Sequence, residues 1–105
     1  MASKQEYIER LKLAVEHLHK CSALYLRTEH VHEKFNGATV WEGEVEVFFI
    51  SGHPRAIHCY AWSDKEGERD EGERFVAVPK IPPVESAETA VRAQIVKDVK
   101  SGYSK

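Results

Sequence analysis

The sequence predicts a single α+β domain with a four-stranded antiparallel sheet, in the element order α-β-β-β-β-α. Three observations lead to this fold class. Apolar residues recur at helical spacing near both ends of the chain, and they alternate with polar residues in the middle. Asn36-Gly37, the strongest short hairpin signal, separates two of the alternating runs. A length of 105 residues fits one domain, so we expect residues 1–105 to fold as a unit.

The first helix is expected over residues 4–22, with Ser3 as its N-cap. A second, smaller apolar stripe lies nearly opposite the main one and contains Leu13 and Leu24, which indicates packing on two sides or on a partner. The main stripe consists of Ile8, Leu11, Val15, Leu18 and Ser22.

Four strands follow this helix. The first two, Thr28–Phe35 and Ala38–Ile50, are expected to form a hairpin around Asn36-Gly37. Arg55–Ser63 and Phe75–Ile81 are the third and fourth, and Pro79 marks the end of the last strand or a place at the sheet edge. Between them, residues 64–74 hold nine charged residues and two glycines, which predicts a flexible charged loop.

The last helix is expected from Ala87 to about Ser101, with Ser86 as its cap and Gly102 as the residue that ends it. The apolar stripe of this helix contains Val91, Ile95 and Val99. We expect both helices to cover the same face of the sheet.

The six histidines are the compositional anomaly, and strand register decides which of them meet. A two-residue turn at Asn36-Gly37 places His32 opposite Trp41 and His30 opposite Gly43. A four-residue loop over 51–54 places Val47 opposite His58. A slip of one residue would move a strand's side chains to the other face. The candidate ligand-binding residues on the resulting aromatic face are His30, His32, Trp41, His58 and Tyr60.

Three kinds of chemistry could use this face. It could line a small-molecule pocket, bind a metal through three imidazoles, or carry out histidine acid–base catalysis with Tyr60 as a hydrogen-bond donor. The sequence has no H-E-x-x-H or C-x-x-C spacing and no evident nucleophile, so we expect no metal and no cofactor and assign no catalytic residue. The leading hypothesis is a non-catalytic module that binds a small molecule or a protein. The alternative is a small lyase, isomerase or hydrolase.

The opposite face is expected to be acidic, with Glu42, Glu44 and Glu46 exposed along the second strand. An apolar patch interrupts it, and the patch would stay exposed if both helices covered the histidine face. Such a patch favours a symmetric homodimer. The candidate interface residues are Phe48, Ile50, Ile57 and Cys59. If the helices instead covered this patch, the histidine face would be open to a ligand.

Composition disfavours several partners. Fifteen basic and seventeen acidic residues give a net charge of −2, which offers no general attraction to nucleic acid or to anionic membranes. The element order is similar to that of double-stranded RNA-binding domains, but Glu85 and Glu88 stand where those domains carry lysines. No apolar run approaches the roughly 18 residues of a membrane span, and residues 1–20 lack a secretory h-region, so we expect a cytoplasmic protein with reduced cysteines.

The pattern W-E-G-x-V-E-V-F, then G-H-P, then Y-A-W, within Val40–Trp62, resembles a small, uncharacterised bacterial protein family. The resemblance continues through Val78–Val96, and the chain is also similar to orphan proteins carried on integron cassettes. Neither resemblance implies an activity or a residue role. A short α+β chain with a curved sheet is also similar to nuclear-transport-factor-like domains, which bind small hydrophobic molecules in the sheet's concavity.

Overall fold

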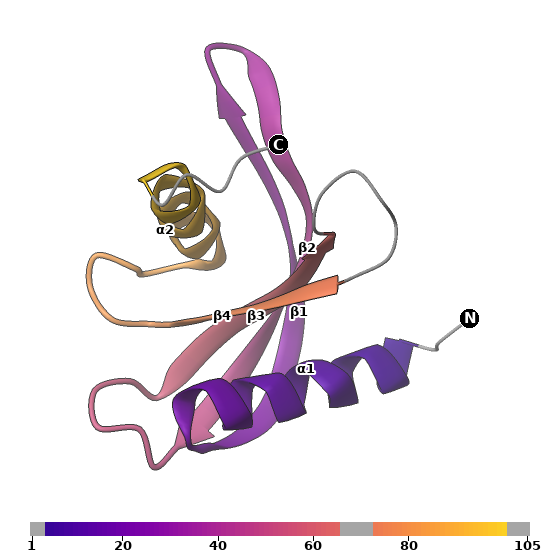
Figure 1. Cartoon of the computed structure of the whole chain (residues 1–105), viewed down its shortest axis with the longest axis vertical. Coiled ribbons are helices and arrows are strands. Elements are labelled where there is room, and N and C mark those ends of the chain that lie inside the picture. Colours follow the sequence, from indigo (N-terminus) through magenta and orange to yellow (C-terminus); the bar gives the residue numbers. More distant parts are fainter. Residues whose placement is uncertain (1–3, 66–72, 101–105) are drawn as a thin grey trace.

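The computed structural model describes residues 4–65 and 73–100, and it confirms the predicted α+β fold (Figure 1). All strand pairs are antiparallel, in the sheet order β1-β2-β3-β4. The elements are α1 (Lys4–His19), β1 (Ser22–Phe35), β2 (Ala38–Ser51), β3 (His58–Lys65), β4 (Glu73–Pro79) and α2 (Ala87–Lys100).

Several predicted boundaries shift. The first helix ends at His19, so Ser22 and Leu24 belong to β1 and not to a helical stripe. Both ends of the predicted charged loop over 64–74 lie in strands β3 and β4, and residues 66–72 lie outside the described part of the chain. Ser3 and Gly102, the predicted cap and end of the helices, also lie outside it.

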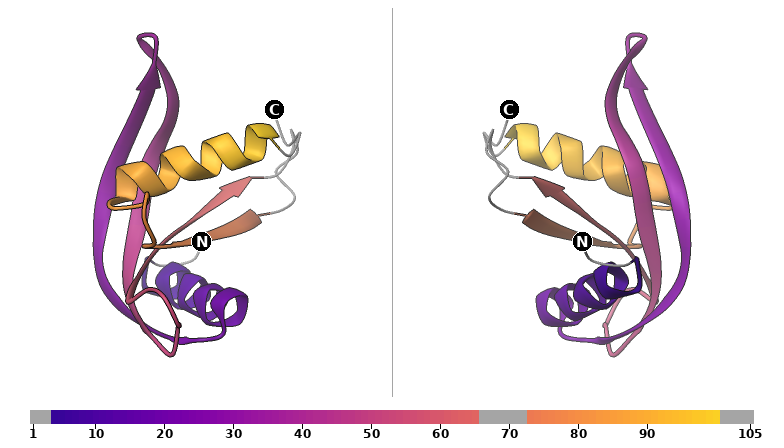
Figure 2. Two further views of the ribbon diagram at one scale, coloured as in Figure 1. Left: turned by 90° about the vertical axis from the view of Figure 1, so that its left-hand side faces the viewer. Right: turned by 90° about the vertical axis from the view of Figure 1, so that its right-hand side faces the viewer.

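The long β1–β2 hairpin turns at Asn36-Gly37 as expected, with φ values of 55° and 81° and Phe35 opposite Ala38. β3 pairs with β2 only between residues 46 and 49 of β2, so the tip of the hairpin diverges from β3 and β4 (Figure 2).

The predicted register between β1 and β2 is wrong by one residue. Lys34 pairs with Thr39, but Glu33 pairs with Trp41, so Val40 is an extra residue that forms a β-bulge. From the bulge onward, His32 lies opposite Glu42 and His30 opposite Glu44. Because of this one-residue slip, the β1 side chains before the bulge lie on the opposite face of the sheet from the one expected.

The β2–β3 register differs by two residues, which leaves the faces unchanged. Val47 lies opposite Tyr60 and not opposite His58, because the connection after Ser51 is longer than four residues. His53 organises this connection: its Nδ1 accepts the backbone N–H groups of Arg55 and Ala56, each at 3.0 Å.

The two helices pack on opposite faces of the sheet, which corrects the expectation that both cover one face (Figure 2). α1 buries Leu11 and Val15 against Phe48, Ile50 and neighbouring residues. α2 packs on the other face, where its core contacts include Val31, Val45, Tyr60 and Trp62. The cause is the mostly apolar run over residues 45–50, which supplies buried side chains to both faces of β2.

α2 begins as expected at the Ser86 cap. The Ser86 hydroxyl accepts the Thr89 N–H at 3.2 Å, and the Thr89 hydroxyl accepts the Ser86 N–H at 2.8 Å, a reciprocal pair that satisfies donors at the helix start. Neither α1 nor α2 is long and apolar enough to cross a membrane.

Candidate functional site

His30 and His32 do not lie on the aromatic face. The observed register places both on the face that carries Glu42 and Glu44, where both imidazoles are exposed. His30 Nε2 lies 3.0 Å from Glu42 Oε2, and His32 Nε2 lies 2.6 Å from Thr39 Oγ1. These contacts are ordinary cross-strand polar pairs on a solvated surface.

The other three candidate ligand-binding residues share the opposite face without forming a site. Trp41 packs edge to face on Trp62, with ring centroids 5.7 Å apart, and His58 packs on Phe49 at 6.2 Å. Tyr60 is 4% exposed. The predicted convergence of His30, His32, Trp41, His58 and Tyr60 is therefore absent, because the one-residue bulge separates the first two from the rest.

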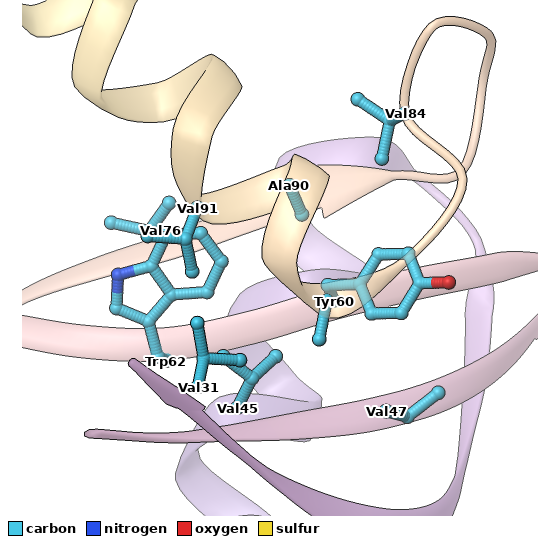
Figure 3. Packing of buried hydrophobic residues seen from close by; sticks show 10 residues of the cluster. Val31, Val45, Val47, Tyr60, Trp62, Val76, Val84, Ala90 and Val91 are labelled. Atoms are coloured by element: carbon cyan, nitrogen blue, oxygen red, sulfur yellow. The ribbon is translucent and has the colours of Figure 1, made fainter. Parts of the chain in front are cut away.

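The aromatic face is filled by α2 (Figure 3). Ala90 and Val91 of this helix lie over Tyr60 and Trp62, with Val76 beside them. Burial raises the pKa of Tyr60, and its hydroxyl donates a long hydrogen bond of 3.5 Å to the Glu85 carbonyl oxygen. This packing is that of a core and leaves Tyr60 unsuited to serve an incoming ligand.

The predicted dimer patch is mostly core as well. Phe48, Ile50 and Cys59 are fully buried beneath α1, while Ile57 is 62% exposed. Burial raises the pKa of the Cys59 thiol to about 12, so it is protonated and unreactive at neutral pH. A second copy cannot reach Phe48, Ile50 or Cys59 without displacing α1.

The acidic row on β2 is not uniformly solvated. Glu46 is fully buried, its Oε1 accepts a hydrogen bond from the Thr28 hydroxyl, and Lys4 Nζ lies 3.0 Å from its Oε2 in an ion pair without hydrogen-bond alignment. Lys4 also donates to Glu44 at 2.7 Å. Burial lowers the pKa of Lys4, but its contacts with these two carboxylates outweigh that effect and raise it. These ion pairs of Lys4 therefore link the start of α1 to β2.

Within residues 4–65 and 73–100, no group of three or more histidine, cysteine and carboxylate side chains could hold a metal ion.

A groove of about 250 Å³ runs beside β4, between the C-terminal end of α1 and the C-terminal half of α2. Figure 1 looks onto β4 from this side, with α2 above the strand and α1 below it. α1 and α2 therefore form the walls of the groove, and the strand forms its floor. The lining residues are Leu18, His19, Arg74, Phe75, Val76, Ala77, Gln94 and Lys97.

β4 is the last strand of the described sheet, and its register shows which peptide groups face the groove. The Lys80 N–H donates to the His58 carbonyl oxygen at 2.8 Å, so the peptide groups of Lys80 point toward β3. Directions alternate along a strand, so those of Val78 also point toward β3, and those of Phe75 and Ala77 point away from it. An edge strand with outward peptide groups can pair with another extended chain.

One outward carbonyl already has a donor. His19 Nε2 lies 2.8 Å from the Ala77 carbonyl oxygen, and since a carbonyl only accepts, the imidazole donates. Pro79 occupies an outward position too, which agrees with the expected place of this residue in an edge strand, because proline has no N–H to offer.

The charged residues of the groove lining are basic. Arg74 forms two hydrogen bonds of 3.0 Å to the Asp98 carboxylate, which Gln94 also contacts at 2.9 Å. The Arg74 contacts lower the pKa of Asp98, against the opposing effect of burial. Arg74 and Lys97 are the cationic groups of the lining, and no carboxylate of the described residues belongs to it.

Sequence reasoning missed this groove. It placed Arg74 in a charged loop, and only Pro79 carried an edge-strand signal. No family model, curated protein or solved structure matches the chain.

Proposed function

We propose that this chain is a non-catalytic protein-binding module, and that the groove beside β4 takes an extended segment of a partner protein as an additional strand. The observation that carries the proposal is the outward direction of the Phe75 and Ala77 peptide groups between two helices. In this mode of recognition, main-chain hydrogen bonds provide affinity and the flanking side chains provide specificity.

The dimensions of the groove favour an extended segment over a small molecule. Small-molecule pockets usually measure about 300–1,000 Å³ and enclose most of their ligand. The groove is smaller, at about 250 Å³, and follows an open strand edge. The aromatic face that could have held a small hydrophobic ligand is occupied by α2.

The charge of the lining indicates the chemistry of the partner. Lys97 and Arg74 both line the groove, and among the described residues no carboxylate does. Asp98, beside the lining, is hydrogen-bonded to Arg74 and also lies within electrostatic reach of Lys97. An acidic side chain on the incoming segment would pair with Lys97 and add a charge-assisted contact to the main-chain hydrogen bonds. We therefore infer a partner segment that is extended, partly apolar and acidic.

The test is a selection of short random peptides displayed on phage against the immobilised chain. We expect enriched peptides to carry Asp or Glu among β-branched residues. Fluorescence anisotropy then compares the Kd of one enriched peptide for Lys97→Glu, Ala77→Pro and the unaltered chain. Both substitutions should weaken binding about fivefold to tenfold, the first by charge reversal and the second by removing the outward N–H.

Lys100→Glu is the matched control, because it makes the same charge change on α2 at a position outside the groove lining. It should leave the Kd within about twofold. If Ala77→Pro fails to fold, the two lysine variants still decide the question. Equal losses for Lys97→Glu and Lys100→Glu, or peptides without acidic residues, would contradict the proposal.

A further inference from the structure

We propose that the groove beside β4 recognises an alternating pattern in its partner: apolar side chains at every second position, which face α1, and acidic side chains at the positions between them, which face α2. This inference rests on the proposed function and names the class of sequence that β4 takes as an added strand. Leu18 determines the first set of positions, and Lys97 determines the second.

The side chains of β4 already alternate between two surroundings. Phe75 and Ala77 pack with the core cluster beneath α1, whereas Val76 packs with the cluster beneath α2. Arg74 belongs to the second set, because it forms two hydrogen bonds of 3.0 Å to a carboxylate on α2. Directly paired residues of neighbouring strands place their side chains on the same face of a sheet. A partner residue opposite Phe75 or Ala77 would therefore face α1, and one opposite Arg74 or Val76 would face α2.

The α1 side of the groove offers an apolar contact. Leu18 and His19 are the residues of α1 in the lining, and Leu18 is 52% exposed. His19 donates its hydrogen bond to the Ala77 carbonyl oxygen, so pairing at Ala77 requires this imidazole to move. The Arg10 guanidinium lies over the Phe75 ring, 5.3 Å from its centre, and is not part of the lining. A partner side chain on this side would cover Leu18, which favours an apolar residue there.

The α2 side of the groove is polar and basic. Gln94 and Lys97 line it from α2, and Arg74 reaches it from β4. Asp98 accepts hydrogen bonds from Arg74 and Gln94, so its carboxylate is already engaged. Two cations against this carboxylate leave the α2 side with a net positive charge, and Lys97 is exposed. An acidic partner residue on this side would form a charge-assisted contact with Lys97.

An extended partner is the conformation that serves both sides at once. Successive side chains of a strand point to opposite faces, whereas apolar residues on one face of a helix recur every three or four positions. The four consecutive lining residues of β4, 74–77, set the length over which the pattern matters. We therefore expect about four partner residues to alternate strictly, with the sequence outside them free to vary.

Fluorescence anisotropy of three labelled octapeptides on the unaltered chain tests this inference. The first peptide alternates valine with glutamate, the second carries the same residues as one block of four valines and one block of four glutamates, and the third alternates valine with lysine. The first should bind about tenfold more tightly than either of the others, because it alone matches both sides of the groove. This comparison needs no variant to fold.

Two pairs of variants assign the two sets of positions. Lys97→Glu should weaken binding of the valine–glutamate peptide about fivefold to tenfold and strengthen binding of the valine–lysine peptide, whereas Lys100→Glu should change neither Kd by more than about twofold. Leu18→Ala should weaken both alternating peptides about fivefold, because both carry the valines that cover it. Leu13→Ala is its control, at an exposed position of α1 outside the lining, and should leave both Kd values within about twofold.

The outcomes separate this inference from the proposed function. Equal binding of the alternating and block peptides, with both weakened by Ala77→Pro, would overturn the inference and leave strand addition at β4 in place. No binding of the three octapeptides, where a phage-selected peptide does bind, would overturn it as well. A Kd that Ala77→Pro leaves unchanged would mean that peptides bind away from the edge of β4, which would overturn both.

Discussion

The imidazole of His19, at the end of α1, donates a hydrogen bond of 2.8 Å to the carbonyl oxygen of Ala77 on β4. This carbonyl oxygen lies on the outer edge of the sheet, where an adjacent strand would otherwise donate a hydrogen bond to it. His19 therefore stands where an N–H of an incoming segment would bind, and the two compete for one acceptor.

His19→Ala should tighten binding of a selected peptide. Losing one competing hydrogen bond, worth about 0.5–1.5 kcal/mol, corresponds to about a twofold to tenfold lower Kd. Titration calorimetry of the variant and the unaltered chain with the same peptide measures this change. Weaker binding by His19→Ala would show that the imidazole contacts the peptide and does not compete with it.

Asp98 should contribute to an acid-dependent loss of stability. Its folded pKa is depressed by Arg74, so its contribution is present above the ordinary carboxyl value, about 4, and is lost as pH falls through the lower folded pKa. At pH 7, Asp98→Asn should lower the free energy of unfolding by about 1–2 kcal/mol. Urea denaturation at a series of pH values should show this difference shrinking below about pH 4. A constant difference would contradict the assignment.

Lys4 should stabilise the chain through the buried carboxylate of Glu46. Lys4→Met leaves that carboxylate without its cation, and we expect a loss of about 1–2 kcal/mol, less than for a fully buried pair because Lys4 is half exposed. Glu44→Gln is the control: it removes only the exposed partner and should cost about 0–0.5 kcal/mol. Thermal and urea unfolding measure both. Equal losses would place the stabilising contact at Glu44.

The element order and the Asn36-Gly37 turn could be predicted, because both depend on local signals. The bulge at Val40 could not, since no glycine or proline marks it. It is stabilised by contacts with α2: Val31 is 1% exposed, and Glu33 reaches Arg92, 59 residues away. Val31 was the available signal, because the predicted register left this isolated valine facing away from the core.

The expectation that both helices cover one face of the sheet was wrong because of how the side chains of β2 were assigned to its two faces. Residues 45–50 of β2 are mostly apolar at successive positions, as in a strand covered on both sides. Treating them as one apolar face and one patch led to the predicted dimer interface at Phe48 and Ile50. The groove beside β4 depends on contacts between residues distant in sequence, such as His19 and Ala77, which no local pattern encodes.

Amide hydrogen exchange of Phe75 and Ala77, with and without a selected peptide, tests the proposed function most directly. Both amides point away from β3, so an added strand would be their new hydrogen-bond partner. We predict that the peptide slows their exchange strongly while that of Val76 and Val78, already bonded within the sheet, changes little. Unchanged exchange at Phe75 and Ala77 under saturating peptide would contradict the account.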